Sequence, residues 1–99
     1  MILKKHFNNG RLILALCDKN LLNKTFEDRL GYLNMASNFY KGEEITEKEI
    51  LTLLDNVYII NAVGKTTVNL LIRKGIVSEN QIKFIKKIPY IQVVFDDRK

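Results

Sequence analysis

The end of the stretch at residues 61–67, NAVGKTT, looks like the end of a nucleotide-binding phosphate loop. Such a loop follows the pattern G-x-x-x-x-G-K-[ST], because its backbone N–H groups surround the phosphates and its lysine reaches them. Counting back from Gly64 places Ile59 where the first glycine is required, inside an apolar, β-like run. The segment after Thr67 offers no acidic strand end for a magnesium ion. The sequence therefore predicts neither nucleotide binding nor nucleotide hydrolysis.

A weaker function remains open for the same residues. Gly64, Lys65, Thr66 and Thr67 end a predicted strand and begin a predicted helix. The free N–H groups of a helix start, together with the charge of Lys65, could hold one phosphate of an RNA backbone. The alternative is a threonine N-cap that follows a glycine turn and binds nothing.

His6 and Cys17 are the only residues of their types, so a Cys–His pair is the first enzyme hypothesis to consider. If Asn9-Gly10 forms a two-residue hairpin turn, His6 pairs with Ile13. Cys17 then lies four residues further along, about 13 Å away and outside hydrogen-bond reach. We predict a structural thiol, no enzymatic activity, no metal site and no cofactor.

The elements that must position these residues follow from turns and caps. Asn9-Gly10 predicts a hairpin of strands 2–7 and 11–17, with Phe7 opposite Leu12, Lys5 opposite Leu14 and Leu3 opposite Leu16 on the core face. The second of these strands is apolar on both faces, so we expect it inside the sheet. Residues 17–28 indicate a loop with one helical turn, and residues 30–36 indicate a weaker strand.

Two helices are expected in the second half of the chain. Thr46 and Glu49 form a capping-box pattern, and Ile45 and Ile50 form a hydrophobic staple around the same helix start. The other helix begins near Thr66 or Thr67 and ends at Gly75. A strand at 57–63 separates the helices, and strands at 82–85 and 90–95 follow, joined around residues 86–89. The pattern predicts one α+β domain over residues 1–99, a mostly antiparallel sheet of about five or six strands with two main helices packed on it.

The charge distribution is asymmetric. The net charge is +5, and all of the excess lies in residues 56–99, which hold eight basic and three acidic residues. Such asymmetry is typical of proteins that bind an anionic partner, most often nucleic acid, although a lysine-rich background composition would also produce it.

Nothing in the sequence indicates a membrane or export. No apolar run approaches the roughly 20 residues that span a bilayer. The start of the chain, MILKKHFNNGRLILALC, holds an apolar run at 12–17 that is shorter than a signal-peptide core of about 7–15 residues. One cysteine cannot form an internal disulfide. We therefore expect a cytoplasmic protein.

Four stretches, taken together, resemble the archaeal domain-of-unknown-function family 424 (DUF424). They are CDKNLLNKTF (17–26), FYKG (39–42), NAVGKTTVNLLIRKGIV (61–77) and IPYIQVV (88–94). The resemblance implies a small cytoplasmic α+β protein of an archaeon, with a suspected link to translation or RNA and no established enzymatic activity. Two departures are visible. Asn23 stands where the family usually has glycine, and Lys86-Lys87 stand where it favours a glycine-rich turn.

The leading hypothesis is an RNA-binding, ribosome- or translation-associated protein that contacts phosphates. Its predicted contacts are Lys65, Arg73, Lys74, Lys83, Lys86 and Lys87, with a further phosphate contact at Gly64, Thr66 and Thr67. The expected partner is RNA or the ribosome, with neither a membrane nor a nucleotide. The alternative is a non-enzymatic protein–protein adaptor that uses an exposed sheet edge or the Phe39-Tyr40 region.

Overall fold

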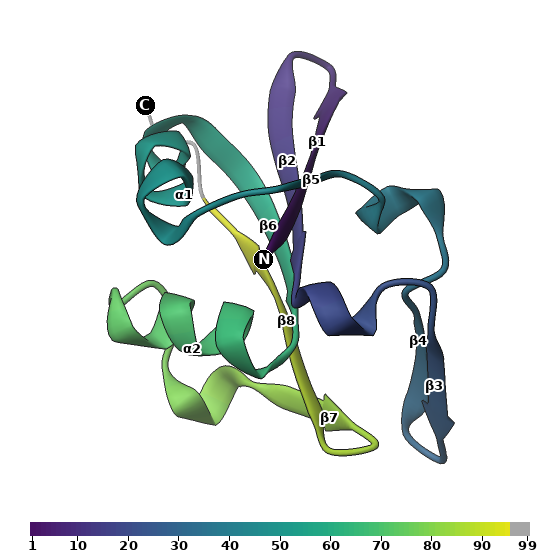
Figure 1. Ribbon diagram of the computed structural model, residues 1–99. Helices are drawn as coiled ribbons and strands as arrows, with labels where there is room; N and C mark the ends of the chain where they lie inside the picture. The colour runs from purple at the N-terminus through teal and green to yellow at the C-terminus, as the bar shows by residue number, and fades with distance from the viewer. Residues whose placement is uncertain (96–99) are drawn as a thin grey trace.

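A computed structural model describes residues 1–95 and confirms the predicted α+β class. Six strands form one sheet in the order β5-β1-β2-β6-β8-β7, and two more form a separate hairpin, β3-β4 (Figure 1). The sheet strands are β1 (Ile2–Asn8), β2 (Arg11–Cys17), β5 (Glu43–Glu44), β6 (Val57–Val63), β7 (Lys83–Ile85) and β8 (Ile88–Val94). The hairpin consists of β3 (Thr25–Asp28) and β4 (Gly31–Asn34).

Two α-helices and four short 3-10 helices complete the fold of the described residues. The α-helices are α1 (Glu47–Leu53), which continues into η3 (Leu54–Asn56), and α2 (Lys65–Arg73). The remaining turns are η1 (Lys19–Leu21), η2 (Asn38–Tyr40) and η4 (Glu79–Gln81). No helix within residues 1–95 is long and apolar enough to cross a membrane.

The first hairpin has the predicted register. Asn9 and Gly10 take φ values of 55° and 78°, the left-handed pair of a type I′ turn, and Phe7 lies opposite Leu12. The predicted core face was wrong at the turn end, because Phe7 is 71% exposed whereas Leu14 is fully buried. The hairpin projects past α1, so the helices cover only its base (Figure 1).

β2 lies inside the sheet, as predicted, between β1 and β6. Its pairing with β6 is parallel, whereas the other strand pairs of the described residues are antiparallel. A parallel neighbour requires a long connection between the two strands, and residues 18–56 supply it. This connection contains the β3-β4 hairpin, of which the sequence predicted only the second strand.

The helix ends follow the predicted capping chemistry. The Glu49 carboxylate accepts the Thr46 N–H at 2.9 Å, and the Thr46 hydroxyl accepts the Glu49 N–H at 3.2 Å, which completes the capping box. At the end of α2, Gly75 takes a φ of 74° and donates to the Ile72 carbonyl, which confirms the left-handed C-cap.

The sheet has two differently covered faces. One packs against α1 and α2 through the larger apolar core, and the other is partly covered by residues 19–40 (Figure 1). The core on the helix side includes Leu14, Leu16, Ile50, Ile60, Leu70 and Leu71. The smaller cluster on the other side is Ile2, Cys17, Met35 and Val63. The sequence did not predict that the second face would stay partly open.

Candidate nucleic-acid interface

The start of α2, where a phosphate contact was predicted, already holds a carboxylate. Asp18, which directly follows β2, accepts the backbone N–H of Thr66 at 3.1 Å and that of Thr67 at 2.8 Å. It also accepts the Thr67 hydroxyl at 2.7 Å. An anion at a helix start is stabilised by these N–H groups and by the helix dipole. The donors predicted for an RNA phosphate are thus occupied by the protein's own side chain.

Gly64 is the N-cap residue of α2, and Asp18 explains why it is glycine. Its φ of 110° and ψ of 155° lie in a region that is essentially restricted to glycine. A Cβ at this position would lie 2.4 Å from the Asp18 Cγ. The alternative of a threonine N-cap is therefore wrong. The N-cap residue is Gly64, and the side chain that caps the helix is that of Asp18, 48 positions before Thr66. No role was predicted for Asp18, and the only sign of it in the sequence is the Cys17-Asp18 pair at the start of the family-like stretch 17–26.

Four of the six predicted basic residues gather around one end of the sheet. The Gly64 N–H donates to the Pro89 carbonyl at 2.8 Å, so the α2 start, with Lys65, lies beside the start of β8. Lys86 and Lys87 form the turn that precedes β8, and Lys83 lies on β7 opposite Tyr90. All four lysines are exposed.

Arg73 and Lys74 belong to a different place. They lie at the far end of α2, more than two helical turns from Lys65. Both pair with Glu47 of α1, at 3.2 Å from Arg73 and 3.8 Å from Lys74. The hydrogen bond between Arg73 and Glu47 raises the pKa of Arg73 and lowers the pKa of Glu47. Part of this positive charge is therefore neutralised within the protein.

The turn Lys86-Lys87 is shorter than predicted. Lys86 and Lys87 take φ values of 53° and 65° and close the hairpin alone, so that Ile88 and Pro89 belong to β8. The Asp28 carboxylate accepts the Lys86 N–H at 2.9 Å. This hydrogen bond is the main cause that lowers the pKa of Asp28, and the hydrogen bond from the Leu30 N–H is the next. The lysine turn is thereby attached to the β3-β4 hairpin.

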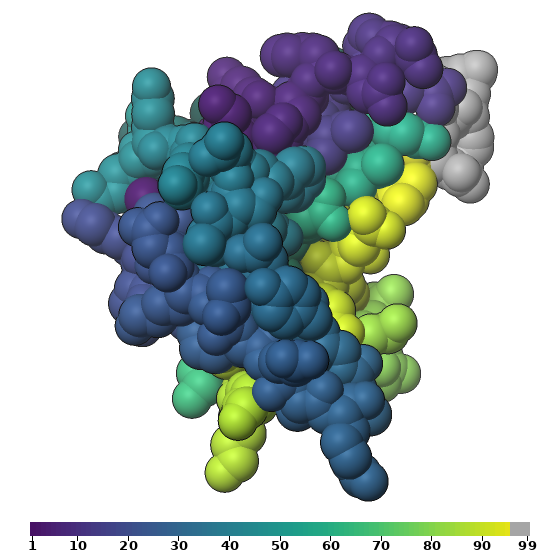
Figure 2. Space-filling view, turned by 90° about the vertical axis from the view of Figure 1, so that its right-hand side faces the viewer, coloured from purple at the N-terminus to yellow at the C-terminus, as the bar shows by residue number. Residues whose placement is uncertain are grey.

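A hollow of about 500 Å³ lies on the partly open face of the sheet. Figure 2 shows this side of the molecule, where residues near β4 and η2 lie against the strand β8. The floor comes from β6 and β8, and the walls come from β4, η2 and the region of β7. Side chains that line it include Leu33, Tyr40, Asn61, Lys83, Tyr90 and Gln92.

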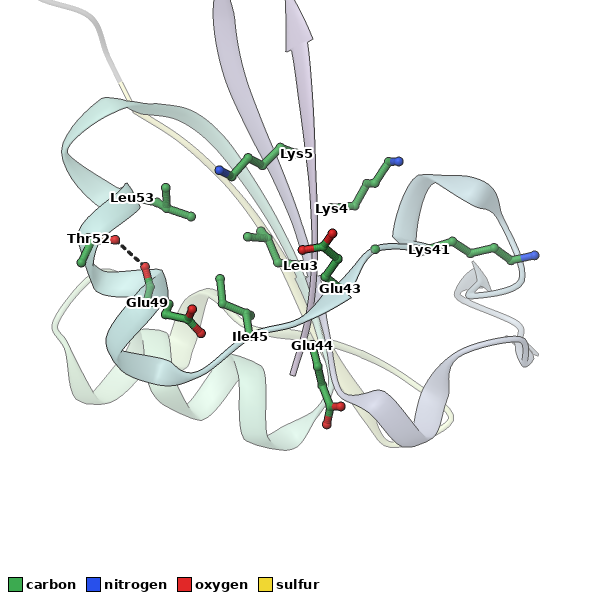
Figure 3. Close-up of a pocket in the computed structure, with 11 residues that line it drawn as sticks. Leu3, Lys4, Lys5, Lys41, Glu43, Glu44, Ile45, Glu49, Thr52 and Leu53 are labelled. Atoms are coloured by element: carbon green, nitrogen blue, oxygen red, sulfur yellow. Dashed lines mark hydrogen bonds between the residues drawn. The ribbon is translucent and has the colours of Figure 1, made fainter.

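A larger hollow of about 720 Å³ lies between β1, β5 and α1 (Figure 3). Its lining mixes charges of both signs, since Lys5 and Lys41 accompany Glu43 and Glu49. The Glu49 carboxylate is held by the capping box. Figure 3 shows Lys41 extending away from α1. This mixed surface favours no single class of charged ligand.

His6 and Cys17 are apart, as the hairpin register predicted. His6 lies opposite Ile13, and Cys17 lies opposite Ile2. The His6 ring stacks on Phe39, and its Nε2 lies 2.9 Å from the Phe39 carbonyl oxygen. Burial raises the pKa of the Cys17 thiol to about 11. The thiol is thus a buried core group rather than a nucleophile poised at neutral pH.

Comparisons with known proteins show the family and the fold of the chain. The chain matches a solved structure described as "Crystal structure of an uncharacterized conserved protein from Methanopyrus kandleri", with a TM-score of 0.82 and 23% sequence identity. The match covers 99% of this chain and 93% of that one, and it concerns the fold. A search of curated proteins finds no match. A family model described as "Protein of unknown function (DUF424)" matches residues 6–95. The chain therefore belongs to the DUF424 family.

Proposed function

We propose that this protein binds RNA through phosphate contacts at the end of the sheet that carries Lys65, Lys83, Lys86 and Lys87. The observation that supports this proposal most is the exposure of these four lysines and their lack of ion-pair partners among the described residues. All are exposed, and none forms an ion pair with another residue in the range 1–95. Lysines that are free of internal partners can release counterions from a nucleic acid backbone, which drives binding.

The charges of the described residues support the same surface. Asp96, Asp97, Arg98 and Lys99 lie outside the described residues, and their formal charges cancel. The excess of positive charge in the second half therefore comes from residues before them. Asp28 and Asp18, the two carboxylates fixed at this end, are each engaged by backbone N–H groups. The archaeal cytoplasm and an association with the ribosome or translation are also part of the proposal, as expectations from the resemblance stated in the sequence analysis.

Salt dependence tests the proposal. A fluorescently labelled single-stranded RNA 12-mer is titrated at several salt concentrations, and host ribosomal subunits serve in a second assay. Each lost phosphate contact reduces the slope of log K against log salt by roughly 0.7 for single strands. Lys86→Ala/Lys87→Ala should reduce the slope by roughly 1–2 and weaken binding to RNAs of all sequences by a similar factor.

The controls use the same change of charge elsewhere. Lys41→Ala/Lys48→Ala removes two exposed lysines, one before β5 and one on α1, and should leave the slope unchanged. Arg73→Ala/Lys74→Ala should have a smaller effect than the Lys86/Lys87 variant, because Glu47 already neutralises part of that charge. Absence of binding at low salt, or equal losses in all three variants, would contradict the proposal.

A second candidate function is a protein–protein adaptor that uses the free edge of β1. β5 covers this edge only at Ile2 and Leu3, and Phe7 near the turn is 71% exposed. Such an edge can accept an added strand from a partner. The Phe39-Tyr40 region fits this function less well, since Phe39 stacks on His6 and Tyr40 packs against the smaller core. Capture of a protein partner that is lost in Phe7→Lys, at unchanged RNA affinity, would favour the adaptor.

A further inference from the structure

The hollow on the partly open face of the sheet contains a pair of amide side chains. Asn61 of β6 and Gln92 of β8 are direct register partners, and the Gln92 Nε2 donates to the Asn61 Oδ1 at 3.0 Å. The next residues on the same face of these strands are Ile59, Val63, Tyr90 and Val94. Asparagine is disfavoured in strands, and here it lies opposite Gln92, whose side chain is exposed on this partly open face.

The bond between the two amides leaves much of their hydrogen-bonding capacity free. One N–H and one carbonyl oxygen are used, and within residues 1–95 no other partner is found for the Asn61 NH2 group or the Gln92 carbonyl oxygen. An exchange of the amide orientations leaves the same total of donors and acceptors. The pair therefore presents donors and an acceptor side by side to the hollow.

The surroundings of the pair select the kind of ligand. Tyr90 and Tyr40 line the same hollow, and Lys83 lies opposite Tyr90 on the neighbouring strand. Side-by-side donors and acceptors match the edge of a nucleobase, aromatic rings contact its faces, and a lysine contacts the adjoining phosphate. A peptide strand would need a free sheet edge to form its main-chain ladder, and the hollow lies on a face.

We propose that this hollow receives one unpaired base of a single-stranded RNA, with Asn61 and Gln92 as the hydrogen-bonding groups. This inference rests on the proposed function and specifies the kind of RNA that the protein binds. The volume of about 500 Å³ lies within the range of about 300–1,000 Å³ that is usual for small-ligand sites. Base-paired RNA does not offer a base to such a site, because its bases are stacked and paired.

The experiment compares RNAs with and without bases. The probes are labelled 12-mers of U, A and C, an abasic 12-mer with the same backbone, and a 12-base-pair RNA duplex, all at one moderate salt concentration. At least one base-bearing single strand should bind the wild-type protein about ten-fold more tightly than the abasic strand and the duplex. Asn61→Leu/Gln92→Leu should bind that strand only as tightly as the abasic one, with an unchanged salt slope.

Two further variants make the result decisive. Asn20→Leu/Asn80→Leu, which changes two exposed amides outside the hollow, should bind like wild type. Gln92→Met alone replaces an exposed side chain and serves if the double variant does not fold. This inference is overturned if abasic and base-bearing strands bind equally well. If Lys86→Ala/Lys87→Ala still reduces the slope of log K against log salt in that case, the proposed function stands. Failure of every strand to bind overturns both.

Discussion

At the residue scale, Asp18 and Gly64 depend on each other. Asp18 approaches the α2 start closely enough to bind two N–H groups only because Gly64 has no side chain. Asp18→Ala should lower the free energy of unfolding by about 1–2 kcal/mol, since it removes the helix cap. Gly64→Ala should lower it by about 2–4 kcal/mol, because backbone strain adds to the lost cap. Urea unfolding followed by circular dichroism measures both.

The double variant tests the link between the two residues. Asp18→Ala/Gly64→Ala should cost less than the sum of the single changes by about 1 kcal/mol, because the clash and the cap disappear together. Gly10→Ala is the control, since Gly10 also has a positive φ but its added Cβ would meet nothing within 4 Å. Additive costs for Asp18 and Gly64 would show that they do not interact.

Cys17 is predicted to be structural. Burial raises the pKa of its thiol from 9.0 to about 11, so the folded protein holds the proton more tightly than the unfolded chain does. The stabilisation from this thiol is complete below pH 9 and is lost as the pH rises through about 11. A thiol reagent at pH 8 should react much more slowly with the native than with the unfolded protein.

Replacement of the thiol provides the complementary measurement. Cys17→Ala should lower the free energy of unfolding by about 1 kcal/mol, as a small truncation of the core, and leave RNA binding intact. Binding that is lost at an unchanged melting temperature would assign Cys17 a functional role instead.

At the element scale, the β7–β8 turn carries a conformational strain that the β1–β2 turn avoids. Both are two-residue turns with positive φ, formed by Lys86-Lys87 in one case and by Asn9-Gly10 in the other. Residues other than glycine and asparagine cost about 1 kcal/mol each in this conformation, whereas glycine and asparagine adopt it readily. Lys86→Asn/Lys87→Gly should therefore raise the free energy of unfolding by about 1–2 kcal/mol, measured by urea unfolding.

The same variant should weaken RNA binding, because it removes two of the proposed phosphate contacts. Stability and binding would then change in opposite directions, as expected where a strained turn serves a function. The converse change, Asn9→Lys/Gly10→Lys, should destabilise the protein and serves as the control. A Lys86→Asn/Lys87→Gly variant no more stable than wild type would refute the strain.

The contact between the two hairpins predicts a dependence on acid pH. Hydrogen bonds to the Asp28 carboxylate, chiefly from the Lys86 N–H and next from the Leu30 N–H, lower the pKa of Asp28 below 3.8. Because the folded pKa is the lower one, the stabilisation is complete above 3.8 and is lost as the pH falls through the folded value. Asp28→Asn should therefore differ most from wild type at neutral pH and converge with it in acid. Glu27→Gln, on the same strand, is the control in a series of thermal melts.

At the scale of the whole molecule, the sheet is built from both halves of the chain. β1 and β2 lie at the start of the chain, and β2 pairs with β6, which follows α1 and η3. Neither half alone can cover the apolar face of its strands, so we expect one cooperative unfolding transition. Separate fragments 1–55 and 56–99 should each lack a sigmoidal urea transition, with the intact chain as the control. A fragment that unfolds cooperatively would contradict this expectation.

The elements that the sequence determined by itself are those stabilised over a few residues. Asn9-Gly10 defined the first hairpin and its register, and Thr46 with Glu49 defined the start of α1. Gly75 defined the end of α2 in the same way. Each of these features depends on hydrogen bonds and dihedral preferences between residues at most a few positions apart, which a sequence pattern records directly.

Only the tertiary structure decided which distant residues meet. Asp18 caps a helix that begins far along the chain, and Glu47 of α1 pairs with Arg73 and Lys74 at the far end of that helix. Asn61 and Gln92 are polar residues within strands, and their pairing depends on the register of β6 against β8. These contacts result from how the sheet and helices pack, and packing depends on the whole chain at once. Local patterns in the sequence carry no record of it.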